Sequence, residues 1–193
     1  MPPPRLVLAS ASETRLRILR QAGFDPAVDP AHVDERFEGE IADGVAVVAE
    51  RKAAAVAPRH PSDVVLACDS LVDLDGRVLG KPASAAQASE WWRALRGRVA
   101  TVWTGQCVTL GDRRVTRALP ATLRFGRPTD AEIDAYCATG EALGAAGGFR
   151  LHGRSGAFIE EISGHPSTIS GVSMPALREM LAEIGVEVTD LWA

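Results

Sequence analysis

The feature that most constrains the fold is VVLAC, a continuous apolar run at residues 64–68. Its residues do not alternate between polar and apolar, so a strand here has no face suited to solvent. Such strands are typical of the centre of a sheet that is covered on both faces. The run therefore predicts an α/β fold with residues 64–68 as a central strand.

The segments before this run predict a strand and two helices. The apolar residues 6–9 predict a short buried strand, and Ser12 is a plausible N-cap for a helix that ends at Gly23. Asp43 is the expected cap of a second helix, which ends before Pro58. This order of elements is what an α/β domain requires.

The segments after the run predict two hairpins and three helices. Asp-Gly at 75–76 and Gly-Asp at 111–112 are expected to form the hairpin turns. Helices are expected over 84–97, over 129–140, where Thr129 and Glu132 form a capping box, and over 175–185. Strands and helices mixed with hairpins predict a mixed β-sheet with flanking helices.

Length and charge limit the class of protein. A chain of 193 residues is most simply one domain, residues 1–193. The formal net charge of -4 argues against a nucleic-acid partner, because binding to the phosphate backbone needs an excess of basic residues. A small phosphorylated ligand needs only a few cations in one pocket, so it remains compatible with this charge.

The cysteines and the apolar segments predict a cytoplasmic protein. Cys68, Cys107 and Cys137 are odd in number and contain no CxxC pair, which fits free thiols in a reducing compartment. The apolar run near the start is too short for a signal peptide, and no stretch approaches the length of a transmembrane helix. We therefore expect no membrane partner.

Asp69 and Lys52 are the first two candidates for a functional site. Asp69 follows the buried strand, and ligands of open α/β sheets bind beyond the carboxyl ends of strands. Asp69 could equally begin a turn. Lys52 lies within the apolar stripe between Val48 and Val56, so its ammonium either extends to solvent or points into a polar pocket.

Two further segments could bind an anion. In Gly80-Lys81-Pro82, the charged lysine lies between a flexible glycine and a rigid proline. A solvated turn lysine is the simpler interpretation. Ser10 and Ser12 lie at the start of the first helix, whose free N–H groups attract anions. Arg15 in that first turn opposes the helix dipole, so it suggests a bound phosphate unless it is simply a surface arginine.

Carboxylates complete the candidate set. Asp34 and Glu35 offer oxygen ligands for a hard cation such as Mg²⁺, although a solvated acidic loop is the default interpretation. The histidines lack the spacing of a zinc site, and no nucleophile elbow is present. Cations, a helix N-terminus and carboxylates together fit a metal-bound polyphosphate.

The order of these motifs resembles one family along nearly the whole chain. The segments LASASETR, VDE, ERKA, ACDSLVDLDGRVLGKP, TGQCV and GAFIEEISGHPSTISGVSMPAL are similar to those of the Maf family of nucleotide pyrophosphatases. The resemblance implies a fold like that of the inosine triphosphate pyrophosphatases, elongated and with a cleft between two lobes. It also implies cytoplasmic hydrolysis of a nucleoside triphosphate to the monophosphate and pyrophosphate, with Mg²⁺ or Mn²⁺. Members of the family are linked to removal of noncanonical nucleotides and to restraint of septum formation.

The resemblance also assigns roles to residues. Asp69 matches the essential acid, which either activates water for in-line attack at the α–β bridge or holds the metal, and Glu35 matches the acid near the metal. The residues that match the phosphate-binding set are Ser10, Arg15, Lys52 and Lys81. Of these, Lys52 and Lys81 are expected to act in catalysis with Asp69, where they stabilise charge on the leaving pyrophosphate.

Three positions depart from the known substrate classes of the family. Enzymes for dTTP and UTP have Arg, Thr and Gln there, and enzymes for 7-methyl-GTP have Trp, Gln and Glu. This chain has Thr14, Ser70 and His152, and Glu13 replaces the usual proline. Because Thr14 is small, we expect a roomy pocket that accepts several bases or modified bases.

A different class of function stays open at this point. The chain could be a nucleotide-sensing regulator of cell division that binds triphosphates without significant turnover. Asp69, Glu35 and the two lysines favour the enzyme, because a sensor needs no acid that activates water. Trp91, Trp92 and Trp103 are expected in the core, although they could also form the surface of a homodimer.

Overall fold

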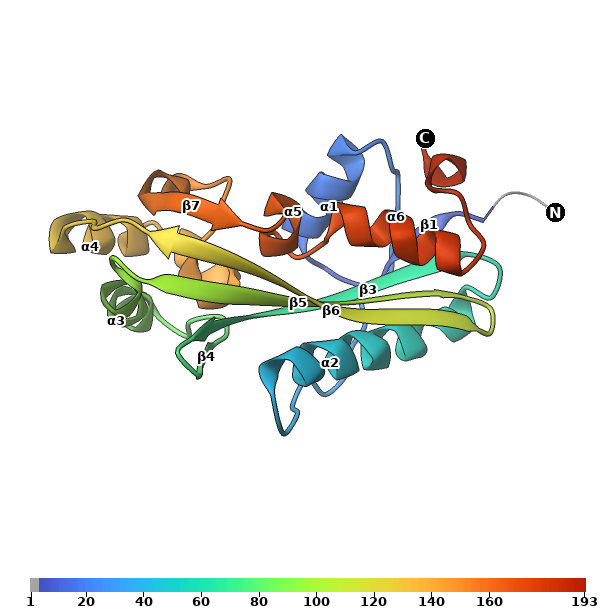
Figure 1. The fold of residues 1–193 in the computed structure, drawn as a ribbon, viewed down its shortest axis with the longest axis horizontal. Helices are drawn as coiled ribbons and strands as arrows, with labels where there is room; N and C mark the ends of the chain where they lie inside the picture. The colour runs from blue at the N-terminus through green and yellow to red at the C-terminus, as the bar shows by residue number, and fades with distance from the viewer. Residues whose placement is uncertain (1–3) are drawn as a thin grey trace. The chain divides into compact units, whose positions relative to one another are not determined.

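Seven strands form one mixed sheet in the computed structural model, which describes residues 4–193 (Figure 1). The strand order is β2-β1-β3-β5-β6-β7, and β4 pairs with β3 outside this path. The strands are β1 (Leu6–Leu8), β2 (Ala27–Val28), β3 (Val64–Leu74), β4 (Arg77–Leu79), β5 (Val99–Leu110), β6 (Arg113–Phe125) and β7 (Ile159–Ser163). β1 is parallel to β2 and β3, whereas β4 is antiparallel to β3 and β7 to β6. The predicted α/β fold with a mixed sheet is therefore confirmed.

Helices flank this sheet. They are α1 (Glu13–Gln21), α2 (Ile41–Val56), α3 (Ala85–Leu95), α4 (Asp130–Ala138), α5 (Pro166–Ile169) and α6 (Met174–Glu183). Short 3₁₀ turns lie at Ala57–Arg59, Glu141–Gly144, Ala146–Gly148, Arg154–Phe158 and Val188–Leu191. All five predicted helices are present.

The chain divides into two compact units, and each is described by itself. The first unit comprises the described part of Met1–Asp69 together with Thr104–Leu119 and Ser170–Ala193. The second comprises Ser70–Trp103 and Pro120–Ile169. Strands β3, β5 and β6 each pass from one unit into the other along the chain.

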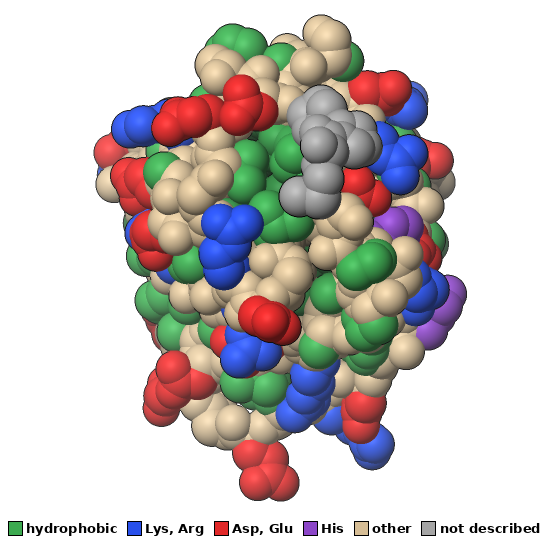
Figure 2. All heavy atoms as spheres, turned by 90° about the vertical axis from the view of Figure 1, so that its right-hand side faces the viewer, with side chains coloured by type: hydrophobic (Ala, Val, Ile, Leu, Met, Phe, Trp, Pro, Cys, Tyr) green, Lys and Arg blue, Asp and Glu red, His purple; other side chains and the backbone are tan. Residues whose placement is uncertain are grey.

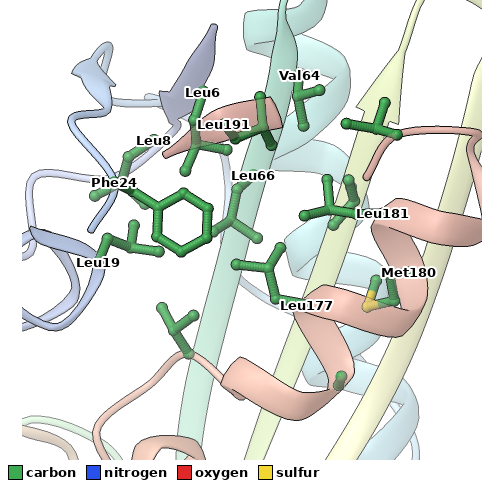
Figure 3. Packing of buried hydrophobic residues seen from close by; sticks show 14 of the residues in the cluster. Leu6, Leu8, Leu19, Phe24, Val64, Leu66, Leu177, Met180, Leu181 and Leu191 are labelled. Atoms are coloured by element: carbon green, nitrogen blue, oxygen red, sulfur yellow. The ribbon is translucent and has the colours of Figure 1, made fainter. Parts of the chain in front are cut away.

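In the first unit, alternate residues of β1 and β3 enter two separate cores. Leu8 and Leu66 belong to the cluster packed against α1 and α6, where Figure 3 shows them converging with Leu177. Val65 and Ala67 belong to the cluster packed against α2. Because neighbouring side chains of a strand point to opposite faces, both faces of β3 are covered here. This is the physical reason for the unbroken apolar run VVLAC.

The core of the second unit is built around Trp92, whose side chain is fully buried. Its ring makes edge contacts with Phe125, Tyr136 and Phe158, at centroid distances of 5.3 to 5.7 Å. Its Nε1 donates a 2.8 Å hydrogen bond to the carbonyl of Gly148. The prediction that Trp92 lies in the core is confirmed, as it is for Trp91, which is 6% exposed. Trp103 on β5 is only half-buried, so the prediction is wrong for that residue.

Local capping and turn chemistry matches the predictions with one exception. Ser12 caps α1, and Thr129 forms the capping box of α4 with Glu132. The turn at 75–76 has positive φ at both residues, as a type I′ turn requires. The predicted cap Asp43 is wrong, because α2 begins at Ile41 with Glu40 as its N-cap, and Asp43 lies in the first turn.

Candidate active site

Lys52 joins two carboxylates in the first unit. Its Nζ lies 2.7 Å from Oδ1 of Asp69 and 2.8 Å from Oε1 of Glu35. Lys52 is 7% exposed and Asp69 is 9% exposed, whereas the side chain of Glu35 is 61% exposed. The site therefore has a buried ion pair and a third, more accessible charge beside it.

The position of Lys52 on α2 explains its burial. Val48 and Val56 lie one turn before and after it on the same face, and both are fully buried against the sheet. Of the two orientations open from sequence, the ammonium points to carboxylates and does not extend to solvent. The burial of a charge at this position is tolerated because the charge is paired and hydrogen-bonded.

Asp69 reaches Lys52 because of its register on β3. Ala67 faces α2, and Asp69 is two residues further along, so it points to the same face of the sheet. The expectation that the strand ends at Asp69 is wrong, since β3 continues to Leu74. The polar residues after Cys68 suggest the end of a strand, but β3 continues through them into the hairpin with β4.

Of the two acids at 34 and 35, only Glu35 contacts Lys52 in the described structure. Asp34 turns to Arg36, with an Oδ2–Nη2 distance of 2.8 Å. The hydrogen bonds from Arg36 lower the pKa of the Asp34 carboxyl below its usual value of 3.8. Glu35 is therefore the member of the pair that belongs to the site.

The strand-to-helix segment of the first unit holds Arg15 in a fixed orientation. Its Nη1 donates to Oγ of Ser10 at 3.1 Å, and its Nε donates to the carbonyl of Gly171 at 3.0 Å. Oγ of Ser12 accepts the backbone N–H of Arg15 at 3.4 Å. Ser10, Arg15 and the half-buried Thr14 thus lie at the opening of α1, as the sequence predicts.

Cys68, which precedes Asp69 on β3, is a buried thiol. Burial raises the pKa of its thiol to about 11, while the positive charges of Arg15 and Lys52 act in the opposite direction. The thiol itself is protonated and unreactive at neutral pH.

The remaining predicted residues belong to the second unit. Lys81 is exposed, and its segment is held by a 2.9 Å hydrogen bond from the N–H of Gly147 to the carbonyl of Gly80. Ser70 directly follows Asp69 on β3, and His152 is exposed in a turn. The expectation that Lys81 meets Lys52 and Asp69 in one cleft stays a prediction.

Gln106 is a buried polar residue to which the sequence analysis gave no role. It is fully buried on β5, accepts the N–H of Ser173 at 2.9 Å and donates to the carbonyl of Ser173 at 3.4 Å. These bonds fix the segment whose Gly171 carbonyl accepts from Arg15. The presence of a glutamine in the apolar strand motif TGQCV was the available sign.

The donor set suits a hard divalent cation that also binds substrate. Within residues 4–193, no group of three or more His, Cys, Asp or Glu side chains could hold a metal by itself. Oδ1 of Asp69 and Oε1 of Glu35 nevertheless both contact Nζ of Lys52, so the two carboxylates lie close to each other. Mg²⁺ commonly binds one or two carboxylates and takes its other ligands from water and substrate phosphates. The residues present fit that mode.

The surface has mixed charge. Acidic and basic side chains are interspersed over the face drawn in Figure 2, as expected for a formal net charge of -4. No helix among the described residues is long and apolar enough to span a membrane.

Comparisons with known proteins agree on one family. The profile of the family described as "Maf-like protein" matches residues 5–184. A protein of Streptomyces avermitilis named "Nucleoside triphosphate pyrophosphatase" is 47% identical, over 99% of this chain and 96% of its own. Proteins of the same name from Corynebacterium aurimucosum and Trichormus variabilis are 45% and 40% identical, over 98% and 97% of this chain and 98% of each relative.

Proposed function

Since this chain belongs to the Maf-like protein family, we propose how its residues carry out the reaction of that family. The chain is a nucleoside triphosphate pyrophosphatase, a hydrolase, as are relatives of that name that match it along nearly its whole length. Such an enzyme cleaves a nucleoside triphosphate between the α- and β-phosphates. The products are the nucleoside monophosphate and pyrophosphate.

We assign the activation of water to Asp69. The oxygen of a water molecule attacks the α-phosphorus in line, the bond to the bridging oxygen breaks, and the bond electrons leave with pyrophosphate. Asp69 orients the attacking water and takes its proton. Lys52 lies 2.7 Å from Asp69 and keeps this carboxylate in place. Its positive charge offsets the negative charge of Asp69, which is lost when the proton arrives.

Glu35 and Asp69 are the residues that would hold a divalent cation. When bound, Mg²⁺ or Mn²⁺ supplies positive charge against the phosphate oxygens. Arg15 then contributes a guanidinium that is already oriented by Ser10 and Gly171, so little rotamer entropy is lost when it binds a phosphate. Lys81 is proposed to add a further positive charge on the leaving pyrophosphate.

Recognition of the base is assigned to Thr14, Ser70 and His152. Thr14 is small, and His152 donates or accepts a hydrogen bond according to its tautomer. We therefore propose that the enzyme accepts several bases, including modified ones. Cleavage of a panel of canonical and modified triphosphates, with both products quantified, tests this, and a preference above about a hundredfold for one base, which is about 2.7 kcal/mol, contradicts it.

The single observation that carries the mechanism is the position of Lys52 between Asp69 and Glu35. Three charged groups from separate segments of the chain meet there, with two of them buried. Such an arrangement costs desolvation energy that an apolar replacement avoids, so its presence favours a functional role.

Asp69→Asn tests the assignment. We expect this change to remove nearly all release of pyrophosphate in the presence of Mg²⁺ or Mn²⁺, while the circular dichroism spectrum is unchanged. Asp25→Asn is the matched control, because Asp25 is exposed and pairs only loosely with Arg20 at 3.6 Å. Full turnover by Asp69→Asn would show that another group activates the water.

The regulator without turnover is not favoured, because the acid and both lysines of the enzyme are present and the relatives carry an enzyme name. We further propose that the enzyme is cytoplasmic and binds no nucleic acid. A homodimer is the proposed assembly to test, and light scattering at several protein concentrations measures it.

A further inference from the structure

Glu35 pairs with Lys52 although its side chain is largely exposed. An exposed ion pair contributes about 0–1 kcal/mol, because long side chains lose entropy and water screens the charges. Lys52 is buried but 61% of the Glu35 side chain is exposed, so water screens part of this ion pair. A further contact holds the segment that carries it.

That contact comes from Arg51, the residue before Lys52 on α2. Its Nη1 donates one hydrogen bond to the carbonyl of Asp34 at 3.2 Å and another to the carbonyl of Arg36 at 2.6 Å. The two acceptors lie on either side of Glu35 in the chain. One guanidinium nitrogen therefore brackets the backbone of Glu35 and leaves its carboxylate to meet Lys52.

Phe37 holds the other end of the same segment against α2. A Cβ on Gly44 would lie 2.2 Å from the ring of Phe37, so the ring occupies the space that the missing side chain leaves on α2. Gly44 is buried in the first turns of that helix. The segment from Asp34 to Phe37 is thus fastened to α2 at two points, of which Arg51 is the one beside Lys52.

We propose that Arg51 is a positioning residue, which places the carboxylate of Glu35 opposite Lys52 and so sets the affinity of the site for a divalent cation. This inference rests on the proposed function for the role of Glu35. Arg51 acts through the main chain and touches neither substrate nor reacting atoms. The two distances on which this inference depends join the guanidinium of Arg51 to backbone carbonyls, and all of these groups belong to the first unit.

Arg51→Gln is the decisive change, because glutamine is also a good helix former and keeps α2 intact. We expect faster hydrogen exchange of the amides of residues 34–37 and faster tryptic cleavage after Arg36. The Mn²⁺ concentration that half-saturates the protein, followed by electron paramagnetic resonance, should rise about 10-fold, as for loss of other residues that support a metal ligand. Arg51→Lys should recover part of each effect.

Arg59→Gln is the matched control. Arg59 lies just after the same helix and is also partly exposed, but its guanidinium donates to the carboxylate of Asp29 and to the carbonyl of Ala55, each at 2.8 Å. It should change neither the exchange of residues 34–37 nor the Mn²⁺ titration. Adding Arg51→Gln to Glu35→Gln should give no further weakening of Mn²⁺ binding, because Arg51 acts only through the carboxylate that Glu35→Gln has already removed.

The outcomes separate this inference from the proposed function. Unchanged exchange at 34–37 in Arg51→Gln overturns the positioning role, and so does a loosened segment with unchanged Mn²⁺ binding. If the wild-type protein hydrolyses no triphosphate, the proposed reaction falls. The exchange and Mn²⁺ measurements then still decide on Arg51, because they do not depend on turnover.

Discussion

Nζ of Lys52 lies 2.7 Å from Oδ1 of Asp69, and both side chains are buried in the first unit. One residue comes from a helix and the other from the interior of a strand, 17 positions apart in sequence. This pair of proposed catalytic residues also affects stability, because removing either charge leaves the other buried without a partner.

Lys52→Met should destabilise the protein by about 3 kcal/mol, because it leaves the buried carboxylate of Asp69 without its partner. The urea midpoint measures this. The double variant with Asp69→Asn should recover part of the loss, because the buried charge is then gone as well. If Asp69→Asn shifts the midpoint by the same amount in the wild type and in the Lys52→Met variant, the pair does not couple.

Gly105→Ala should displace α2 and lower activity. A Cβ on residue 105 would lie 1.9 Å from the carbonyl oxygen of Val45, and backbone atoms cannot move aside cheaply. We expect a loss of about 3 kcal/mol in stability, with turnover reduced because Lys52 lies two turns further along the same helix. Gly80→Ala is the control for thermal unfolding, since its Cβ would meet only a side-chain atom at 4.0 Å. Matching melting temperatures for the two variants would refute the close approach.

Gln106→Leu should weaken substrate binding at Arg15 without a large change in the volume of the core side chain. The change leaves the N–H and carbonyl of Ser173 without the glutamine, which costs about 2 kcal/mol. Because the nearby Gly171 carbonyl orients Arg15, we expect a higher KM for the triphosphate. Gln21→Leu, at the exposed end of α1, serves as the comparison. If KM is unchanged in both variants, Gln106 does not affect substrate binding.

Asp29 should contribute to the acid stability of the first unit. Hydrogen bonds from Arg59 and His60 lower the pKa of its carboxyl from 3.8 to about 2. The folded value is below the unfolded value, so the stabilisation is present above about pH 4 and is lost as the pH falls toward 2. Arg59→Gln should bring the pKa of Asp29 back toward 3.8, which a carbon-detected NMR titration measures. A titration that stays near 2 in the variant would assign the shift to His60 alone.

Local chemistry made several elements of this fold predictable. Ser12, Thr129 and the turn at 75–76 act on neighbouring backbone groups, so their roles follow from the residues beside them. The run 64–68 is apolar on both faces because two different cores cover it. Candidate residues of the site were also recognisable by type, since cations and carboxylates are what a polyphosphate and its metal require.

The sequence by itself determined the fold class, the element order and the chemical types in the site. Only the tertiary structure decided that Lys52 turns inward, that Glu35 and not Asp34 meets it, and that Asp69 lies within a strand that continues beyond it. It also decided the role of Arg51, whose acceptors are 15 and 17 residues away. The physical reason is range: caps and turns depend on a few adjacent residues, whereas the direction of a buried charge depends on the groups that folding brings to it.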